Sequence, residues 1–173
     1  MSLEVSRIED KATKILKENN AYSLPVDVES LLDSLDIELE VRELENEFSG
    51  FLVSRGSKYA IVVNRQHAKV RQRFTVAHEI GHYLLHAKRK GKESVFIDRF
   101  HFRRSNPQPQ GLNYKEEREA NTFAAGLLMP SELVRKYMDE GEVTSIKGIA
   151  EEFNVSPQAM EYRLKDLGFI QIG

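Results

Sequence analysis

The sequence predicts an α+β fold that is mostly helical, with a small β-sheet in its N-terminal part and a helix-turn-helix-like segment at the C-terminal end. Three observations predict it: helical spacing of apolar residues over much of the chain, apolar alternation within residues 37–63, and Gly, Pro and Asn breaks between short helices. At 173 residues the chain can bury a core of its own. We expect a main domain at residues 1–130 and a C-terminal helical segment at residues 131–173, packed on the core.

The composition excludes several kinds of site. The sequence has no cysteine, so disulfides, thiolate ligands and a thiol nucleophile are absent, and a metal would need His, Asp or Glu. A net charge of −2 gives no general reason to expect nucleic acid or an anionic membrane as partner. Residues 1–20 carry charges where a signal peptide is apolar, and no segment approaches a membrane span. We therefore expect a cytosolic protein.

The first third of the chain is predicted to hold two helices, a strand and a hairpin. Apolar residues at helical spacing indicate the helices, and alternation of apolar with charged residues indicates the strand. Gly56 lies between two apolar runs and suits the turn of a hairpin. These elements are expected at residues 6–18 and 28–35 (helices), 37–41 (strand), and 48–53 with 59–63 (hairpin).

Further helices are expected on both sides of a polar connection. Asn64 should end the last strand and cap a helix over residues 66–88. A long connection then covers residues 90–115, with one strand expected at residues 94–102. The remaining helices are expected at residues 115–128, 131–139, 145–153 and 157–167.

The helix over residues 66–88 contains the motif HExxH, in which His78 and His82 are four residues apart and Glu79 follows the first histidine. Two imidazoles at this spacing lie one turn apart on one helical face, close enough to bind one metal ion. Glu79 then faces the open side of the ion, where it can take a proton from the attacking water and pass it to the leaving amine. The motif predicts His78 and His82 as ligands and Glu79 as the catalytic base.

A catalytic zinc takes a third protein ligand and leaves one position open. His86 continues the spacing, but a straight helix places it about 12 Å along the axis from His78. We therefore expect His86 beside the site or on the surface. The metzincin pattern needs a histidine six residues after His82, where the sequence has Lys88.

A carboxylate from the helix over residues 115–128 is the remaining source of a third ligand. Glu117 is the best candidate, because Asn121 lies four residues later on the same face and could orient a metal-bound histidine. Glu119 is the second candidate. Ala120 and Ala124 keep this face thin, so the two helices can approach closely.

Two features of the chemistry remain open in the sequence. Tyr83, Tyr114 and His101 are candidates for stabilising the oxyanion of a peptide hydrolysis, and spacing favours none of them. Two histidines and one carboxylate suit zinc, but they also accept manganese, cobalt or iron.

The two segments RQRFTVAHEIGHYLLH and EREANTFAAGLLMP together resemble the ImmA/IrrE family of zinc metallopeptidases. In that family a helix with HExxH is followed by a helix with ExxAN, then FA and LLMP, and the resemblance covers about residues 64–130. It implies a gluzincin-like core and limited proteolysis of a helix-turn-helix repressor of a phage, mobile element or stress regulon. It also implies His78, His82 and Glu117 as zinc ligands and Glu79 as base.

The connection between the two motif-bearing helices is basic. Residues 87–118 hold nine basic and four acidic side chains, a local balance of +5, which suits either a substrate-recognition loop or a solvated loop. The basic residues are Lys88, Arg89, Lys90, Lys92, Arg99, Arg103, Arg104, Lys115 and Arg118, and the acidic ones are Glu93, Asp98, Glu116 and Glu117.

The C-terminal segment resembles a helix-turn-helix, with a turn at residues 154–156 and Pro157 opening the second helix. Residues 140–173 nevertheless hold six acidic and three basic side chains, which suits packing or protein docking better than phosphate contact.

From the metal motif and the family resemblance, our leading hypothesis is an endopeptidase that inactivates a repressor. The alternatives are an antitoxin-like module that binds a repressor without cutting it and, least favoured, a DNA-binding protein.

Overall fold

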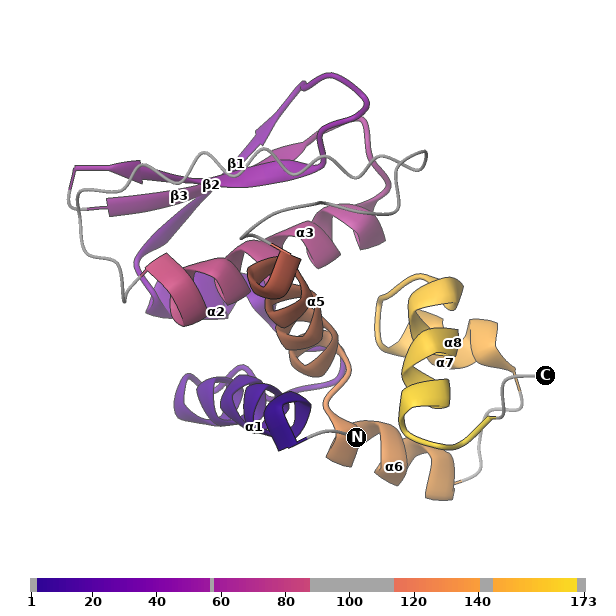
Figure 1. Cartoon of the computed structure of the whole chain (residues 1–173). Helices are drawn as coiled ribbons and strands as arrows, with labels where there is room; N and C mark the ends of the chain where they lie inside the picture. Colours follow the sequence, from indigo (N-terminus) through magenta and orange to yellow (C-terminus); the bar gives the residue numbers. More distant parts are fainter. Residues whose placement is uncertain (1–2, 57, 88–113, 141–144, 171–173) are drawn as a thin grey trace.

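The computed structural model describes residues 3–56, 58–87, 114–140 and 145–170. This part of the chain combines helices with one three-stranded sheet, and the helices lie on one side of it, which confirms the predicted α+β class (Figure 1). The strand expected at residues 94–102 lies outside the described residues. In chain order the elements are α1 (Leu3–Glu18), α2 (Val28–Ser34), β1 (Ile37–Arg42), β2 (Gly50–Arg55), β3 (Lys58–Asn64), α3 (Lys69–His82), the π-helical turn η1 (Tyr83–Ala87), α5 (Tyr114–Leu128), α6 (Ser131–Glu140), α7 (Ile146–Glu152) and α8 (Pro157–Asp166).

The sheet has the strand order β1-β3-β2. Strands β2 and β3 form the predicted antiparallel hairpin, and Gly56 in its turn has a φ of +65°, which favours glycine. Strand β1 pairs in parallel with β3, a partner that the alternation in β1 does not predict. The central strand β3 is the most buried, with Ala60, Ile61, Val62 and Val63 at most 1% exposed.

Asn64 does not cap the following helix, so that prediction is wrong. Helix α3 begins at Lys69, and its N-cap residue Ala68 makes no side-chain capping hydrogen bond. Asn64 is fully buried, and its Nδ2 donates to backbone carbonyls of residues 44–48. Its Oδ1 accepts from the backbone N–H of Gln66 at 3.0 Å. The side chain therefore stabilises the loop between β1 and β2.

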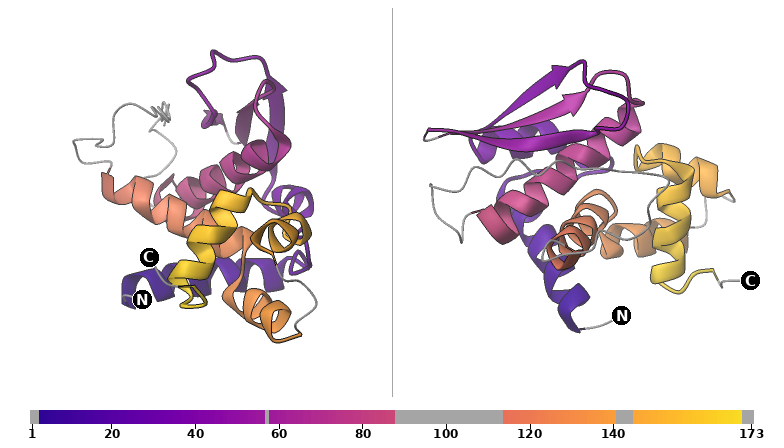
Figure 2. Two further views of the ribbon diagram at one scale, coloured as in Figure 1. Left: turned by 90° about the vertical axis from the view of Figure 1, so that its right-hand side faces the viewer. Right: turned by 45° about the horizontal axis from the view of Figure 1, so that its top comes forward.

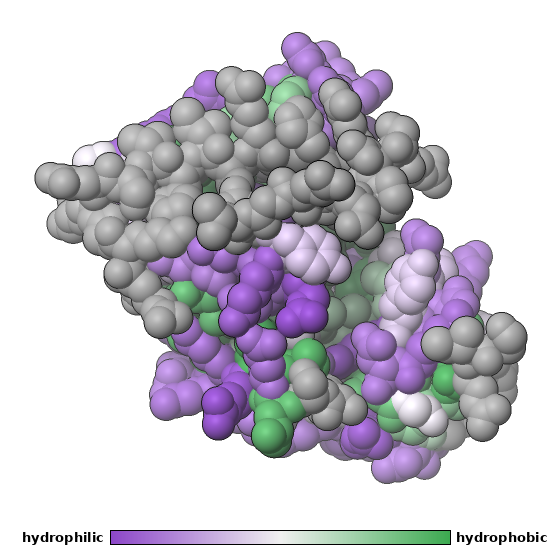
Figure 3. All heavy atoms as spheres, viewed as in Figure 1, coloured by the Kyte–Doolittle hydropathy of each residue, from purple (hydrophilic) through white to green (hydrophobic). Residues whose placement is uncertain are grey.

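The helices form layers beneath the sheet. Helix α3 lies between the sheet and α5, and α1 packs on the opposite side of α5 (Figures 1 and 2). Helices α6, α7 and α8 gather at one end of this stack (Figure 2). Among the described residues that are visible in Figure 3, hydrophilic ones predominate, and apolar residues can be seen in the hollow between α5 and the C-terminal helices. No helix in the described ranges is both long and apolar enough to cross a bilayer.

Helices α3 and α5 approach each other at Gly81, inside the HExxH motif. A Cβ atom added there would lie 3.2 Å from both Cα and O of Ala120 and 3.2 Å from the ring of Phe123. Ala120 and Ala124 are both fully buried, which confirms the thin contact face predicted for α5. This close approach brings the α5 carboxylates within reach of the α3 histidines.

A Gly81→Val substitution is expected to lower the free energy of unfolding by about 1 to 3 kcal/mol, because the added atoms overpack a contact made with the α5 backbone. Urea unfolding of the metal-free protein measures the loss. The control is Lys14→Val on α1, where the side chain is 72% exposed and the change should cost no more than about 0.5 kcal/mol. Equal costs for the two variants would contradict the close packing.

The C-terminal helices α7 and α8 pack against each other, and their buried apolar residues belong to the hydrophobic core of the whole chain. Five apolar residues of these helices are buried, and the turn between the helices contains Asn154 with a φ of +50°. Arg163, one of the three basic residues of this segment, is 2% exposed and pairs with Glu9 of α1. It is therefore not available to bind phosphate. The five buried apolar residues are Ile149, Ala150, Phe153, Met160 and Leu164.

Candidate metal centre

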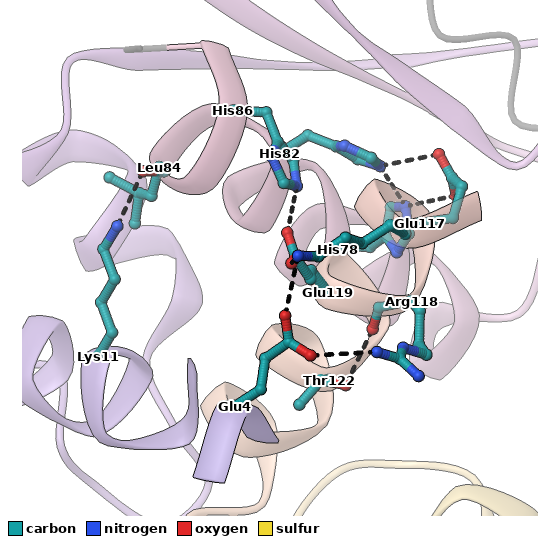
Figure 4. Close-up of polar contacts among 11 residues, drawn as sticks. Glu4, Lys11, His78, His82, Leu84, His86, Glu117, Arg118, Glu119 and Thr122 are labelled. Carbon is teal, nitrogen blue, oxygen red and sulfur yellow. Dashed lines mark hydrogen bonds and ion pairs between the residues drawn. The ribbon is translucent and has the colours of Figure 1, made fainter. Parts of the chain in front are cut away.

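Three side chains from two helices converge into a group that could hold a metal ion. His78 and His82 come from α3 and Glu117 comes from the first turn of α5, and one ligand atom of each lies within 4.8 Å of the others. The two histidines are buried, and the Glu117 side chain is 17% exposed. Figure 4 shows the Glu117 carboxylate turned toward the two imidazoles. Among the described residues, the histidines are thus enclosed and the carboxylate keeps a small exposed fraction.

The distances within this group fit a small divalent cation. The Nε2 atoms of His78 and His82 are 2.8 Å apart, and they lie 3.5 and 3.2 Å from the two carboxylate oxygens of Glu117. Ligands bound tetrahedrally at zinc distances are about 3.3 Å from one another. The donor types and their spacing therefore suit zinc.

The orientation of His78 is set by Asn121, as the spacing on α5 predicts. The Nδ1–H of His78 donates to Oδ1 of Asn121 at 3.0 Å. This bond selects the tautomer in which Nε2 carries no proton, the form in which an imidazole can bind a metal through that atom. Glu79, next to His78 on the same helix, is fully buried.

The remaining polar candidates lie around this group. His86 is 8% exposed, so of the two predicted locations it occupies the one beside the site and not the surface. Glu119 faces His86, with 3.6 Å between its Oε2 and Nε2 of His86, and is not part of the metal-binding group. The second candidate for third ligand therefore points elsewhere.

The three candidates for stabilising the oxyanion differ in their location and exposure. Tyr83 is 8% exposed, its ring centroid is 4.8 Å from that of Tyr59 in β3, and burial raises the pKa of its hydroxyl. Tyr114 begins α5 and is 52% exposed. His101 lies outside the described residues. The role stays open among these candidates.

Two charges of the basic connector have structural partners that the sequence analysis missed. Lys115 Nζ is 3.0 Å from Oε1 of Glu4 and 3.5 Å from Oε1 of Glu119. Arg118 donates to Oε2 of Glu4 at 3.2 Å. Ion pairs between residues more than 100 positions apart leave no local signal in the sequence. The other basic residues of the connector lie outside the described ranges.

The pKa shifts of His78 and Glu117 favour the protonation states that bind a cation near neutral pH. Burial lowers the pKa of His78 below its ordinary 6.5, so the imidazole is neutral and its lone pair is available. Burial acts to raise the pKa of Glu117, but hydrogen bonds and charge from His78 and His82 in their protonated forms outweigh it and lower this pKa to about 2. A neutral imidazole and an ionised carboxylate are the forms that bind metal.

These shifts predict that the metal-free protein loses stability on acidification. Both groups bind fewer protons in the folded than in the unfolded chain, so the contribution of His78 declines below about pH 6.5 and that of Glu117 between about pH 4.5 and 2. Each group contributes at most about 1.4 kcal/mol per pH unit. Urea unfolding at several pH values measures the slope, and His78→Gln should make it shallower between about pH 6.5 and 4.5. An unchanged slope in that variant would contradict the prediction.

An HExxH helix packed against a carboxylate-bearing helix in an α+β fold defines a metallopeptidase domain. The chain belongs to the ImmA/IrrE family, because the sequence model of the IrrE N-terminal-like domain matches residues 33–165. It is also 28% identical over 113 residues to the metallopeptidase ImmA of Bacillus subtilis (strain 168). That match spans 64% of this chain and 58% of ImmA.

A solved structure supports the same fold. A Mycobacterium tuberculosis transcriptional regulator superposes with a TM-score of 0.63 over 92% of this chain and 47% of the regulator. The sequence identity is 14%, so this likeness concerns the fold alone. The family assignment confirms the resemblance seen in the two linked motifs.

Proposed function

We propose that this protein is a cytosolic zinc-dependent endopeptidase that inactivates a helix-turn-helix transcriptional repressor by limited proteolysis. The observation that carries the proposal is the convergence of His78, His82 and Glu117 into one group beside the buried Glu79. Family membership supports a metallopeptidase chemistry for this group. The particular metal, substrate and residue roles are the proposal.

Zinc is the metal that these donors suit best, because two imidazoles and one carboxylate leave a fourth position for the reaction. When bound, the metal polarises the scissile carbonyl and lowers the pKa of the attacking water. Manganese, cobalt and iron accept the same donors, so metal analysis of the purified protein has to decide among them.

Each residue of the group has a distinct role in this proposal. His78 and His82 hold the metal through Nε2, and Asn121 keeps the His78 ring in the required tautomer. Glu117 supplies the third ligand from α5. Glu79 accepts the proton of the attacking water and delivers it to the leaving amine, which avoids an unstable leaving group.

The choice of substrate rests on relatives. One relative is named a metallopeptidase, ImmA. The resemblance of the two motifs to the ImmA/IrrE family extends this to the cleavage of a repressor. Since the chain spans 58% of ImmA, the substrate is the part of the proposal that most needs an experiment.

The test is to incubate the zinc-loaded protein with a repressor encoded beside its gene and to follow the repressor by mass spectrometry. We expect two discrete fragments that form only with metal and not after chelation. An intact repressor held in a stable complex with the zinc-loaded protein would instead support the non-catalytic binding module. Repressor that is neither cut nor bound would overturn both functions for that partner.

A further inference from the structure

His86 lies against the metal-binding group although it is not one of its ligands. Its ring centroid is 5.6 Å from that of His82, with the planes tilted by 53°. The residue is 8% exposed, and its Nε2 lies 3.6 Å from Oε2 of Glu119 (Figure 4). The ring is thus enclosed between a predicted metal ligand and a carboxylate on α5.

A change of helix type places His86 in this position. The α-helical hydrogen-bond pattern of α3 ends at His82, and the chain continues as the π-helical turn η1. Lys11 of α1 donates to the backbone carbonyl of Leu84 within this turn at 2.9 Å. Such π-helical turns occur frequently at functional sites. His86 lies within this turn, and its Nε2 is on the side of Glu119.

Glu119 is held in place on its other side. Its Oε1 is 3.5 Å from Nζ of Lys115, and this ammonium is 3.0 Å from Glu4 of α1. The arrangement opposes a second metal ion at His86 and Glu119, because Lys115 already neutralises the carboxylate and the pair offers only two ligands. The pair is better suited to fixing the position of a side chain.

We infer that His86 is a positioning residue that, packed between His82 and Glu119, fixes the His82 imidazole in its metal-binding orientation. The inference rests on the proposed function, because it takes His82 to be a metal ligand. A histidine ring turns about two side-chain torsions, and the neighbouring ring removes that freedom for His82. A ligand that is oriented in advance binds metal more tightly.

The test measures the affinity for zinc by chelator competition in the wild type, His86→Ala, Glu119→Gln and the double variant. His86→Ala is expected to bind zinc about 10- to 100-fold more weakly, the usual effect of losing a group that orients a ligand. Glu119→Gln should cost less. The double variant should bind no more weakly than His86→Ala, because Glu119 acts through His86.

A spectroscopic readout separates positioning from a loss of folding. The visible spectrum of the cobalt-substituted protein should change in His86→Ala, and His86→Phe should restore part of the affinity because it returns a ring to the same place. His67→Ala is the matched control: His67 precedes α3, its Nε2 lies 3.2 Å from the Asn46 carbonyl, and its loss should leave both readouts unchanged.

Wild-type affinity together with an unchanged cobalt spectrum in His86→Ala would overturn the inference. If that variant does not fold, His86→Phe and Glu119→Gln decide by the same measurements. Additive losses in the double variant would overturn the part assigned to Glu119. None of these readouts needs a substrate, so a protein that shows them and cuts no repressor contradicts the proposed function alone. Where a repressor is cut, His86→Ala should lower kcat more than it changes KM.

Discussion

A Glu79→Gln variant is expected to bind zinc as tightly as the wild type and to cut the repressor about 10²- to 10⁴-fold more slowly, the usual contribution of a general base. This loss corresponds to about 3 to 5 kcal/mol of transition-state stabilisation. Glutamine has nearly the same shape as glutamate, so the buried position next to His78 stays filled, but an amide cannot accept the proton of the attacking water. Metal analysis and single-turnover cleavage measure the two halves of the prediction.

The control for this substitution is Glu38→Gln on β1, where the side chain is exposed and lies outside the metal-binding group. Both readouts should match the wild type. Cleavage at the wild-type rate by Glu79→Gln would contradict the proposed role of Glu79 as the general base. Loss of zinc from the same variant would instead assign Glu79 a part in binding the metal.

The metal-binding group follows from short-range patterns that the sequence shows directly. Helix geometry fixes His78 and His82 on one face, and the same geometry pairs Glu117 with Asn121 on α5. Small residues at Gly81 and Ala120 then allow the two helices to meet. The pairs within each helix depend on residues one turn apart, where periodicity is informative, whereas the meeting of Gly81 and Ala120 joins positions far apart in the sequence.

The features that the sequence could not predict depend on contacts between distant segments. The alternation in β1 indicates a strand, but its parallel pairing with β3 is decided by the helices that cover the sheet. No residue type in the sequence marks the π-helical turn that contains His86. The spacing of apolar residues therefore predicts a regular helix there. Asn64 is a residue type that often caps helices. In the fold its side chain is buried and instead forms hydrogen bonds with the backbone of Phe48 and Gln66.

The C-terminal helices show how a long-range ion pair changes the interpretation of a motif. Arg163 of α8 donates through Nη2 to Oε2 of Glu9 at 3.0 Å and through Nε to the carbonyl of Met129 at 2.9 Å. Both partners are buried, and Gly126 of α5 allows the close approach, since an added Cβ would lie 3.0 Å from Glu9. The pair joins α1, α8 and the segment between α5 and α6, so we expect residues 1–130 and 131–173 to unfold together.

An Arg163→Ala substitution is therefore expected to lower the free energy of unfolding by about 3 to 5 kcal/mol, because it leaves the Glu9 carboxylate buried without its cation. Replacing both residues by methionine should recover most of this loss, since an apolar pair of similar volume avoids the desolvation of two charges. Urea unfolding measures all three proteins, and a single transition in the wild type checks the joint unfolding. A loss below about 1 kcal/mol in Arg163→Ala would mean that the pair is solvated and that the C-terminal helices are held by their apolar contacts.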